Sequence, residues 1–271
     1  MIAVESSGRL GNQLFQFAFG IAAATRLGTS FVMRDDDLRR VFVLAPYRRF
    51  GGRVARSLRF RAGQALRPYR VVKIHDETFG DPAEALEHLA DRTVYSGLFH
   101  SERFFTAVRA QVLAAFTFRP EHERRFQDRY ADLLETPYVC CHVRRTDFVT
   151  LGVALPSSFY FDALSVLAPA DGWPIVFVGD DLVGLKREFG RIKCARFERN
   201  DEALDLLLMA GASAVVMANS TFSWWGAYLN RRPGKSVIVP DLGERRSGLQ
   251  RALPDGWQRV PVGTPTGPVA R

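Results

Sequence analysis

The chain has 271 residues, 47% of them hydrophobic, which is typical of a folded globular protein and excludes a disordered one. It contains no apolar run of about 18 residues and no secretory leader, so we expect a cytoplasmic protein without a membrane span. The net charge of +8 predicts an anionic ligand or partner, and three cysteines are too few for a disulfide framework.

Short apolar runs alternate with helical patterns at the start of the chain. Residues 2–6 predict a strand, residues 13–28 a helix that stops at a glycine, and residues 30–34 another strand. This order is typical of an α/β protein. The alternation is interrupted over residues 91–105 and 115–135, and we therefore place a lobe boundary near residue 135.

A basic segment lies inside the amino-terminal lobe. Between Asp37 and Asp76 there are eleven arginine or lysine residues and no acidic residue. Apolar residues recur there every four positions, so we hypothesise that residues 39–73 contact a membrane carrying lipid-linked sugars. A solvated basic face is the alternative. The segment lacks regularly interleaved aromatic residues, so we expect no nucleic-acid partner.

The carboxy-terminal half keeps the alternation of strands and helices. The predicted strands are 138–144, 174–181, 213–219 and 235–240, and the predicted helices are 157–168, 181–190 and 201–212. Apolar strands between helices predict a parallel sheet covered on both faces. We therefore expect an α/β fold with two Rossmann-like lobes, residues 1–135 and 136–260, a cleft between them, and a flexible tail over residues 261–271.

Ligands of such sheets bind where the strands end, so the residues after each strand are the candidates for function. After the first strand, Gly8 and Gly11 allow a tight turn, and Asn12 and Gln13 provide amide groups at a helix start. A purely structural turn is the alternative.

Two arginines follow the most apolar strand, in the stretch His142–Phe148. Strand alternation would place Arg144 and Arg145 on opposite sides, with Arg145 neutralised by Asp147. Arg144 would then be free to bind a phosphate, since a guanidinium matches phosphate geometry. Structural salt bridges for both arginines are the alternative.

Polar residues also follow two further strands. Asp180 and Asp181 are suited to bind Mg²⁺, to accept the donor edge of a guanine, or to cap the next helix. Residues 219–223 open a helix with an amide and hydroxyl groups, which predicts a site for a diphosphate. Trp224 and Trp225 are expected to pack that helix against the core, although one of them could wall the ligand site.

These stretches together resemble the alpha-1,2-fucosyltransferases of glycosyltransferase family 11. The resemblance rests on residues 8–20, 96–105, 142–148, 177–181 and 206–229, and spans nearly the whole chain. It implies a GT-B-type fold, GDP-fucose as donor, inversion at the anomeric carbon, and no metal or cofactor. By the same analogy, Arg144 would be catalytic and contact the β-phosphate, and Arg145 and Asp147 would be structural. The residues implied to bind the donor are Asn12, Gln13, His142, Arg144, Asp181, Asn219, Ser220, Thr221, Phe222 and Ser223.

The predicted function is transfer of L-fucose to a glycan hydroxyl, with the 2-hydroxyl of a terminal galactose as the expected acceptor, free or lipid-linked. The alternatives are transfer in another linkage or from another GDP-sugar, and a basic nucleic-acid-binding protein. No carboxylate identifies itself as the general base, because Asp147 is expected to pair with Arg145.

Overall fold

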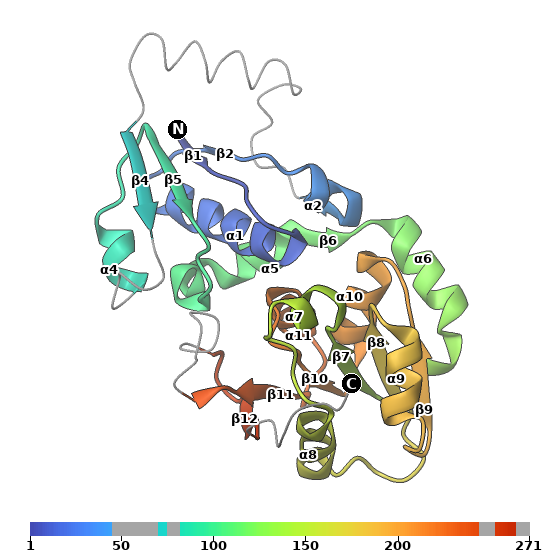
Figure 1. Ribbon diagram of the computed structural model, residues 1–271. Coiled ribbons are helices and arrows are strands. Elements are labelled where there is room, and N and C mark those ends of the chain that lie inside the picture. Colours follow the sequence, from blue (N-terminus) through green and yellow to red (C-terminus); the bar gives the residue numbers. More distant parts are fainter. Residues whose placement is uncertain (45–69, 75–81, 244–252, 264–271) are drawn as a thin grey trace. The chain divides into compact units, whose positions relative to one another are not determined.

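The computed structural model describes residues 1–44, 70–74, 82–243 and 253–263 (Figure 1). They divide into a first unit, Met1–Arg119 with Arg251–Leu253, and a second unit, Pro120–Gln250 with Pro254–Arg271. The division precedes the boundary expected near residue 135, because the helix that begins at Pro120 packs against a helix of the second unit.

The first unit contains a four-stranded parallel sheet in the order β2-β1-β5-β4 and an antiparallel pair, β3 and β6. Its strands are β1 Ile2–Val4, β2 Phe31–Val32, β3 Phe42–Leu44, β4 Arg70–Ile74, β5 Thr93–Gly97 and β6 Phe116–Phe118. Its helices are α1 Leu10–Arg26, α2 Asp36–Val41, α4 Pro82–Glu87 and α5 Arg109–Ala115, with short 3₁₀ turns at Glu102–Phe104 and Thr106–Val108.

Helix α1 is the central helix of the first unit. Almost all of its side chains are buried, and Phe17 and Phe19 pack against aromatic residues of the sheet and its following loops. The polar side chains on such a helix need partners inside the protein, because an unpaired buried polar group is costly. Asn12, Gln13 and Gln16 find those partners in the loops that follow the strands.

The second unit contains a six-stranded sheet in the order β12-β11-β10-β7-β8-β9, with every described pair parallel. Its strands are β7 Val139–Val143, β8 Ile175–Gly179, β9 Ala195–Glu198, β10 Ala214–Val216, β11 Ser236–Asp241 and β12 Gln258–Pro261. Its helices are α6 Pro120–Arg129, α7 Thr146–Thr150, α8 Ser157–Leu167, α9 Leu182–Phe189, α10 Glu202–Gly211 and α11 Thr221–Leu229, with a 3₁₀ turn at Ala131–Leu133.

Helices cover both faces of this sheet. Residues of α8 and α9 share a buried cluster with Val139, Cys141 and Val143 of β7. Strand alternation sends His142 to the opposite face, where its ring lies against Phe222 of α11. On that face α10 and α11 approach so closely that a Cβ on Gly226 would lie 2.6 Å from a Met209 carbon.

Strand order reverses once in each sheet. In the second unit the chain runs from β7 to β8 and β9 on one side, then returns to place β10 on the other side of β7. In the first unit β1 has β2 on one side and β5 on the other. Ligands of parallel sheets bind at such reversals, at the carboxyl ends of the strands.

The predicted α/β alternation is confirmed, and the structure adds strands that the sequence pattern did not predict, among them β9 and β12. The interruption expected over residues 91–105 contains β5, which pairs in parallel with β1 and β4. The strand predicted through residue 144 ends at Val143, and α7 follows after two residues. Residues 45–69, which hold most of the basic segment, and residues 264–271 of the expected tail lie outside the described residues.

Two basic residues of that segment lie in α2 and form ion pairs. Arg39 pairs with Asp35 at 2.6 Å and Arg40 pairs with Asp37 at 2.9 Å. Asp35 and Asp37, which precede the basic segment, therefore neutralise its first two arginines. None of the helices in the described ranges combines the length and the apolar character needed to cross a bilayer.

Candidate functional site

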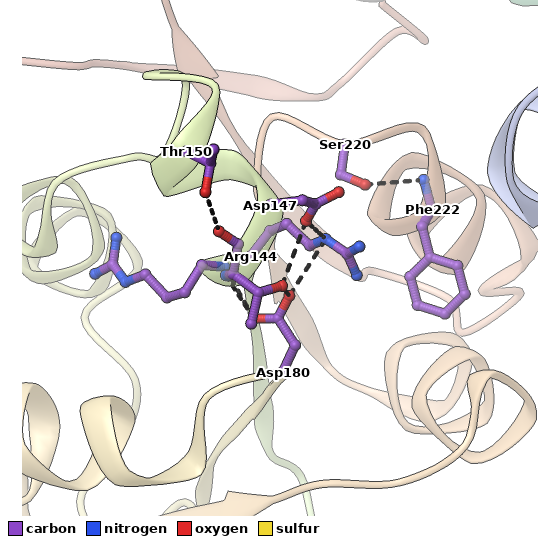
Figure 2. A network of polar contacts seen from close by, with 8 residues as sticks. Arg144, Asp147, Thr150, Asp180, Ser220 and Phe222 are labelled. Carbon is purple, nitrogen blue, oxygen red and sulfur yellow. Dashed lines mark hydrogen bonds and ion pairs between the residues drawn. The ribbon is translucent and has the colours of Figure 1, made fainter.

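Three polar segments of the second unit lie at the carboxyl edge of its sheet, around the reversal between β7 and β10. Residues 144–147 follow β7, Asp180 and Asp181 follow β8, and residues 219–223 follow β10. Contacts between Thr146 and Asp180 and between His142 and Phe222 join these segments. The topology therefore brings together most of the candidates of this half of the sequence (Figure 2).

Arg144 is held by two carboxylates through one nitrogen. Its Nε lies 2.9 Å from Asp147 Oδ1 and 3.4 Å from Asp180 Oδ2. The prediction that Asp147 neutralises Arg145 and leaves Arg144 unpaired is therefore wrong. The pairing is of the i,i+3 kind, because the chain enters the turn of α7 and the strand alternation used for the prediction ends at Val143.

The terminal nitrogens of Arg144 remain available to a ligand. The Arg144 side chain is 22% exposed, and both of its carboxylate contacts within the described ranges use Nε. Figure 2 shows the terminal nitrogens pointing toward the side on which Ser220 and Phe222 lie. Asp147 and Asp180 partly neutralise the guanidinium of Arg144. What Arg144 presents to a ligand is therefore a pair of terminal N–H donors held in a fixed direction, more than an unpaired positive charge.

Arg145 forms its contacts within the second unit, with a partner other than the predicted Asp147. Its guanidinium forms an ion pair with Glu188 of α9 and donates to the carbonyl oxygen of Leu155. Ser157 Oγ donates to the same Glu188 carboxylate at 2.6 Å. These contacts tie the starts of α7 and α8 to the end of α9, so Arg145 fixes the backbone from which Arg144 projects.

Asp180 organises the start of α7. Its carboxylate accepts from the backbone N–H of Arg145 at 2.9 Å and from the hydroxyl of Thr146 at 2.6 Å. Burial by itself would raise the pKa of Asp180, but these hydrogen bonds and the nearby Arg144 outweigh burial and lower it. Asp180 is therefore a charged structural acceptor at neutral pH.

Asp181 caps helix α9. One carboxylate oxygen accepts from the backbone N–H of Gly184 at 3.0 Å, which is the capping alternative that the sequence left open.

His142 is almost fully buried, with 3% of its surface exposed. Burial lowers its pKa to about 4, against a smaller opposing effect of Asp180, so the ring is neutral at physiological pH. Its Nδ1 is buried and has no hydrogen-bond partner among the described residues. The ring is 5.5 Å from that of Phe222, which places both aromatic groups beside the β7–β10 reversal.

The segment after β10 begins helix α11, as predicted. Ser220 Oγ caps the helix by accepting from the N–H of Phe222 at 3.2 Å, and Asn219, Thr221 and Phe222 are partly exposed. Ser223 is fully buried, and its hydroxyl lies within hydrogen-bond distance of the carbonyl oxygens of Ala218 and Ser220. The structure thus places Ser223 in the turn's own hydrogen bonds, away from a surface that a diphosphate could reach.

Trp224 and Trp225 are both buried, at 1% and 0% exposure. They pack edge to face on each other, and Trp224 also stacks on Tyr228. The prediction that they anchor α11 to the core is confirmed, and neither forms a wall of an exposed site.

The glycine turn of the first unit has the backbone that its sequence predicts. Gly8 has φ +72°, where an L side chain is strained, and its carbonyl oxygen accepts from Gln13 Nε2 at 3.1 Å. Gln13 Nε2 also donates to Asp37 at 2.6 Å and is only 6% exposed, so both of its N–H groups serve the fold. Asn12 is partly exposed, and its Oδ1 lies 3.2 Å from His100 Nε2.

A half-buried carboxyl that the sequence pattern did not point to, Asp205, lies at the same edge of the second unit. Asp205 lies in the first turns of α10, and Asn200 Nδ2 donates to it at 3.0 Å. Burial raises the pKa of Asp205 to about 7, although the bond from Asn200 acts in the opposite direction. The available signal was an acidic residue inside the apolar run Ala203–Met209, where a solvated position is not expected.

Within the described ranges, no three histidine, cysteine, aspartate or glutamate side chains are grouped so that they could hold a metal ion. Asp180 and Asp181, the pair considered for Mg²⁺, accept hydrogen bonds at the starts of α7 and α9.

Comparison with solved structures identifies the fold. The fucosyltransferase NodZ from Bradyrhizobium superposes with a TM-score of 0.57 at 15% identity, covering 89% of this chain and 94% of that one. POFUT1 in complex with GDP-fucose superposes with a TM-score of 0.56 at 12% identity, covering 88% of this chain and 97% of that one. The fold is therefore of the GT-B type.

Two curated proteins of Escherichia coli are similar in sequence. An alpha-1,2-colitosyltransferase is 24% identical over 96% of this chain and 99% of its own length. The O-antigen biosynthesis glycosyltransferase WbnK is 29% identical over 43% of this chain and 42% of its own length. The sequence pattern described as Glycosyl transferase family 11 matches residues 1–259. This match confirms the resemblance noted in the sequence, and the chain is a glycosyltransferase that belongs to family 11.

Proposed function

We propose that this protein transfers L-fucose from GDP-fucose to a hydroxyl group of a glycan, with inversion at the anomeric carbon and without a metal cofactor. The 2-hydroxyl of a terminal galactose is the proposed acceptor group. The observation that carries the proposal is the Arg144 guanidinium, held through Nε by two carboxylates beside the capped start of α11.

The arrangement around Arg144 suits a diphosphate leaving group. When the bond between the sugar and GDP breaks, its electron pair goes to the β-phosphate oxygen, and negative charge develops there. Arg144 provides fixed N–H donors, and the first turn of α11 provides backbone N–H groups at the positive end of a helix. Donors held in place before the reaction stabilise that charge without further reorganisation.

The neutral residues nearby suit the nucleoside. A buried uncharged imidazole such as His142, next to the ring of Phe222, gives a base an apolar, aromatic contact and one hydrogen-bonding atom. A carboxylate such as Asp181 accepts the paired N–H groups of a guanine edge. We therefore retain Asn12, His142, Arg144, Asp181, Asn219, Ser220, Thr221 and Phe222 as proposed donor-binding residues.

Gln13 and Ser223 take supporting roles in this proposal. The amide of Gln13 and the hydroxyl of Ser223 are used inside their own turns, so they shape the loops that face the ligand. Asp147 is a poor general base, because its carboxylate is bonded to Arg144.

A similar solved structure supports the choice of donor, since crystals of the NodZ alpha-1,6-fucosyltransferase were soaked with GDP-fucose. A second candidate donor comes from the curated relative named for colitose. Colitose is the 3-deoxy form of L-fucose, so a site that uses the same contacts to GDP would discriminate only through that one hydroxyl.

The test is to incubate the purified chain with GDP-fucose and a panel of galactose-terminated acceptors, and to measure GDP release and product linkage. GDP-colitose and GDP-mannose serve as parallel donors, and a reaction without acceptor gives the background. We expect acceptor-dependent GDP release with GDP-fucose and an α-1,2 product. Turnover with GDP-colitose alone would assign the other donor, and release from none of the donors would overturn the proposal.

A further inference from the structure

His100 lies at the carboxyl edge of the first unit's sheet, in the loop after β5. Its neighbour across that edge is Asn12, in the first turn of the helix after β1, and β1 and β5 are adjacent parallel strands. The strand order reverses between these two strands. His100 and Asn12 thus flank the position at which a parallel sheet binds ligands.

The Asn12 carboxamide is fixed from two sides. His100 Nε2 lies 3.2 Å from its Oδ1, and a Cβ on Gly8 would lie only 2.4 Å from its Nδ2. Gly8 therefore leaves room for the amide nitrogen, while His100 engages the amide oxygen. An amide held in this way keeps one orientation of its two N–H groups, which are donors suited to sugar hydroxyls.

The backbone that carries His100 is strained. Phe99 has φ +54°, which is unfavourable for a bulky residue, yet it is fully buried and stacks on Phe19 at 3.9 Å between ring centroids. Gln16 Nε2 holds the point where this loop begins, by donating to the carbonyl oxygen of Gly97, the last residue of β5, at 3.0 Å. Backbone strain of this kind persists where the surrounding structure enforces it, and it is concentrated at functional sites.

The protonation of His100 decides which role it can play. Burial lowers its pKa to about 4, so its imidazole is neutral at physiological pH. The Asn12 oxygen only accepts hydrogen bonds, so the single imidazole proton is on Nε2. A group with such a low pKa is a poor general base at neutral pH, which leaves the imidazole as a hydrogen-bond donor to Asn12.

We propose that His100 is a positioning residue for glycosyl transfer, which orients the Asn12 carboxamide so that its N–H groups bind a hydroxyl of the donor or acceptor sugar. This role rests on the proposed function, because it requires the first unit to bind a sugar during transfer. The ring centroid of His100 also lies 5.3 Å from that of Phe15, so the size of the ring contributes to packing while its N–H group bonds Asn12.

A kinetic experiment separates the effect of the His100 N–H group from the effect of the packing of its ring. His100→Phe keeps an aromatic ring but removes the N–H, and we expect the transfer rate to fall about tenfold, the loss of one net hydrogen bond. GDP affinity, measured by calorimetry, should stay unchanged. His100→Gln restores a donor and should recover most of the rate, and His88→Phe, the same substitution at an exposed histidine, should match wild type.

Two further measurements show whether His100 acts through Asn12. The double variant His100→Phe, Asn12→Ala should be no slower than Asn12→Ala alone, since the two residues form one unit. Long-range ¹H–¹⁵N NMR of the imidazole should show a proton on Nε2 in wild type and a changed tautomer balance in Asn12→Ala. Michaelis constants for GDP-fucose and for acceptor, compared across the variants, show which sugar the amide binds.

The outcomes distinguish this inference from the proposed function. If wild type transfers sugar and His100→Phe matches it, or if the double variant shows the product of the two single losses, the positioning role is wrong. A loss of rate below about pH 6.5 that occurs in wild type but not in His100→Gln would show a titrating histidine and would also overturn it. If the wild-type protein does not use any of the GDP-sugars as a donor, the proposed function is wrong, and the role of His100 is wrong with it.

Discussion

The two units present loops at the same topological position but with different chemistry. In the second unit the carboxyl ends of β7 and β8 carry Arg144, Asp147 and Asp180, a charged cluster. In the first unit the start of α1, after β1, carries Asn12 and the loop after β5 carries His100, and both are neutral at physiological pH. The difference shows that parallel-sheet topology supplies the location of a site, while the residues in the loops determine which ligand groups it can bind.

We propose that each set of loops binds one part of the donor. Diphosphate oxygens are bound best by charge-assisted donors such as a guanidinium, whereas sugar hydroxyls need neutral groups that donate and accept. The comparison therefore predicts that substitutions in the second unit affect the leaving group, and that those in the first unit affect the sugar.

The largest expected effect comes from Arg144→Ala. The variant should fold like wild type and lose about 10²–10³ in transfer rate, comparable to removal of one oxyanion donor in other enzymes. The measurement is initial-rate GDP release, with circular dichroism to verify folding. Arg144→Lys keeps the charge but loses the directed fork, so it should recover only part of the rate. A folded Arg144→Ala protein with near wild-type turnover would remove Arg144 from the mechanism.

Arg145→Ala should act on stability instead. The substitution leaves Glu188 without its cation and removes the tie to Leu155, so we expect a loss of about 2 kcal/mol in the free energy of unfolding. Chemical denaturation measures this loss. The exposed Arg187 on the same helix as Glu188 provides the control, because Arg187→Ala should change stability by less than about 0.5 kcal/mol. Unchanged stability in Arg145→Ala would contradict the structural assignment.

A smaller effect is expected from the pH dependence of Asp205. Its pKa rises from 3.8 to about 7 on folding, so the folded state binds this proton more tightly than the unfolded chain does. Stability of wild type should therefore fall, relative to Asp205→Asn, as the pH increases from about 4 to about 7. The measurement is the denaturation midpoint of both proteins at each pH in this range. Subtracting one protein from the other removes the contribution of the titrating groups that they share.

Asp171→Asn, at an exposed site, is the control for this comparison. Its difference from wild type should not change with pH in the same way. A constant difference between wild type and Asp205→Asn over the whole range would show that Asp205 is solvated and titrates normally.

The smallest expected effect is that of metal removal. If Arg144 and the start of α11 neutralise the leaving diphosphate, transfer should be unchanged after dialysis against EDTA. The measurement is the same GDP-release assay with and without added Mg²⁺ or Mn²⁺. Loss of activity that a divalent ion restores would indicate that a metal ion, rather than Arg144 alone, stabilises the leaving group.

The fold class, the family and the segments that meet at the candidate site were predictable from the amino-acid sequence. Apolar strands between amphipathic helices are a local pattern, so β7, β8, β10 and the helices after them could be located without coordinates. The family resemblance rests on contiguous motifs, and Trp224 and Trp225 were assigned to the core from their place on a helix.

The pairing of side chains, by contrast, required the folded structure. The partner of Arg145, Glu188, is 43 residues away, and the partner of Asn12, His100, is 88 residues away, so no local pattern connects them. The choice of Arg144 as the arginine bound to Asp147 depended on where β7 ends and α7 begins. Such contacts are set by packing between segments distant in sequence, which also determines the burial that keeps His100 and His142 neutral.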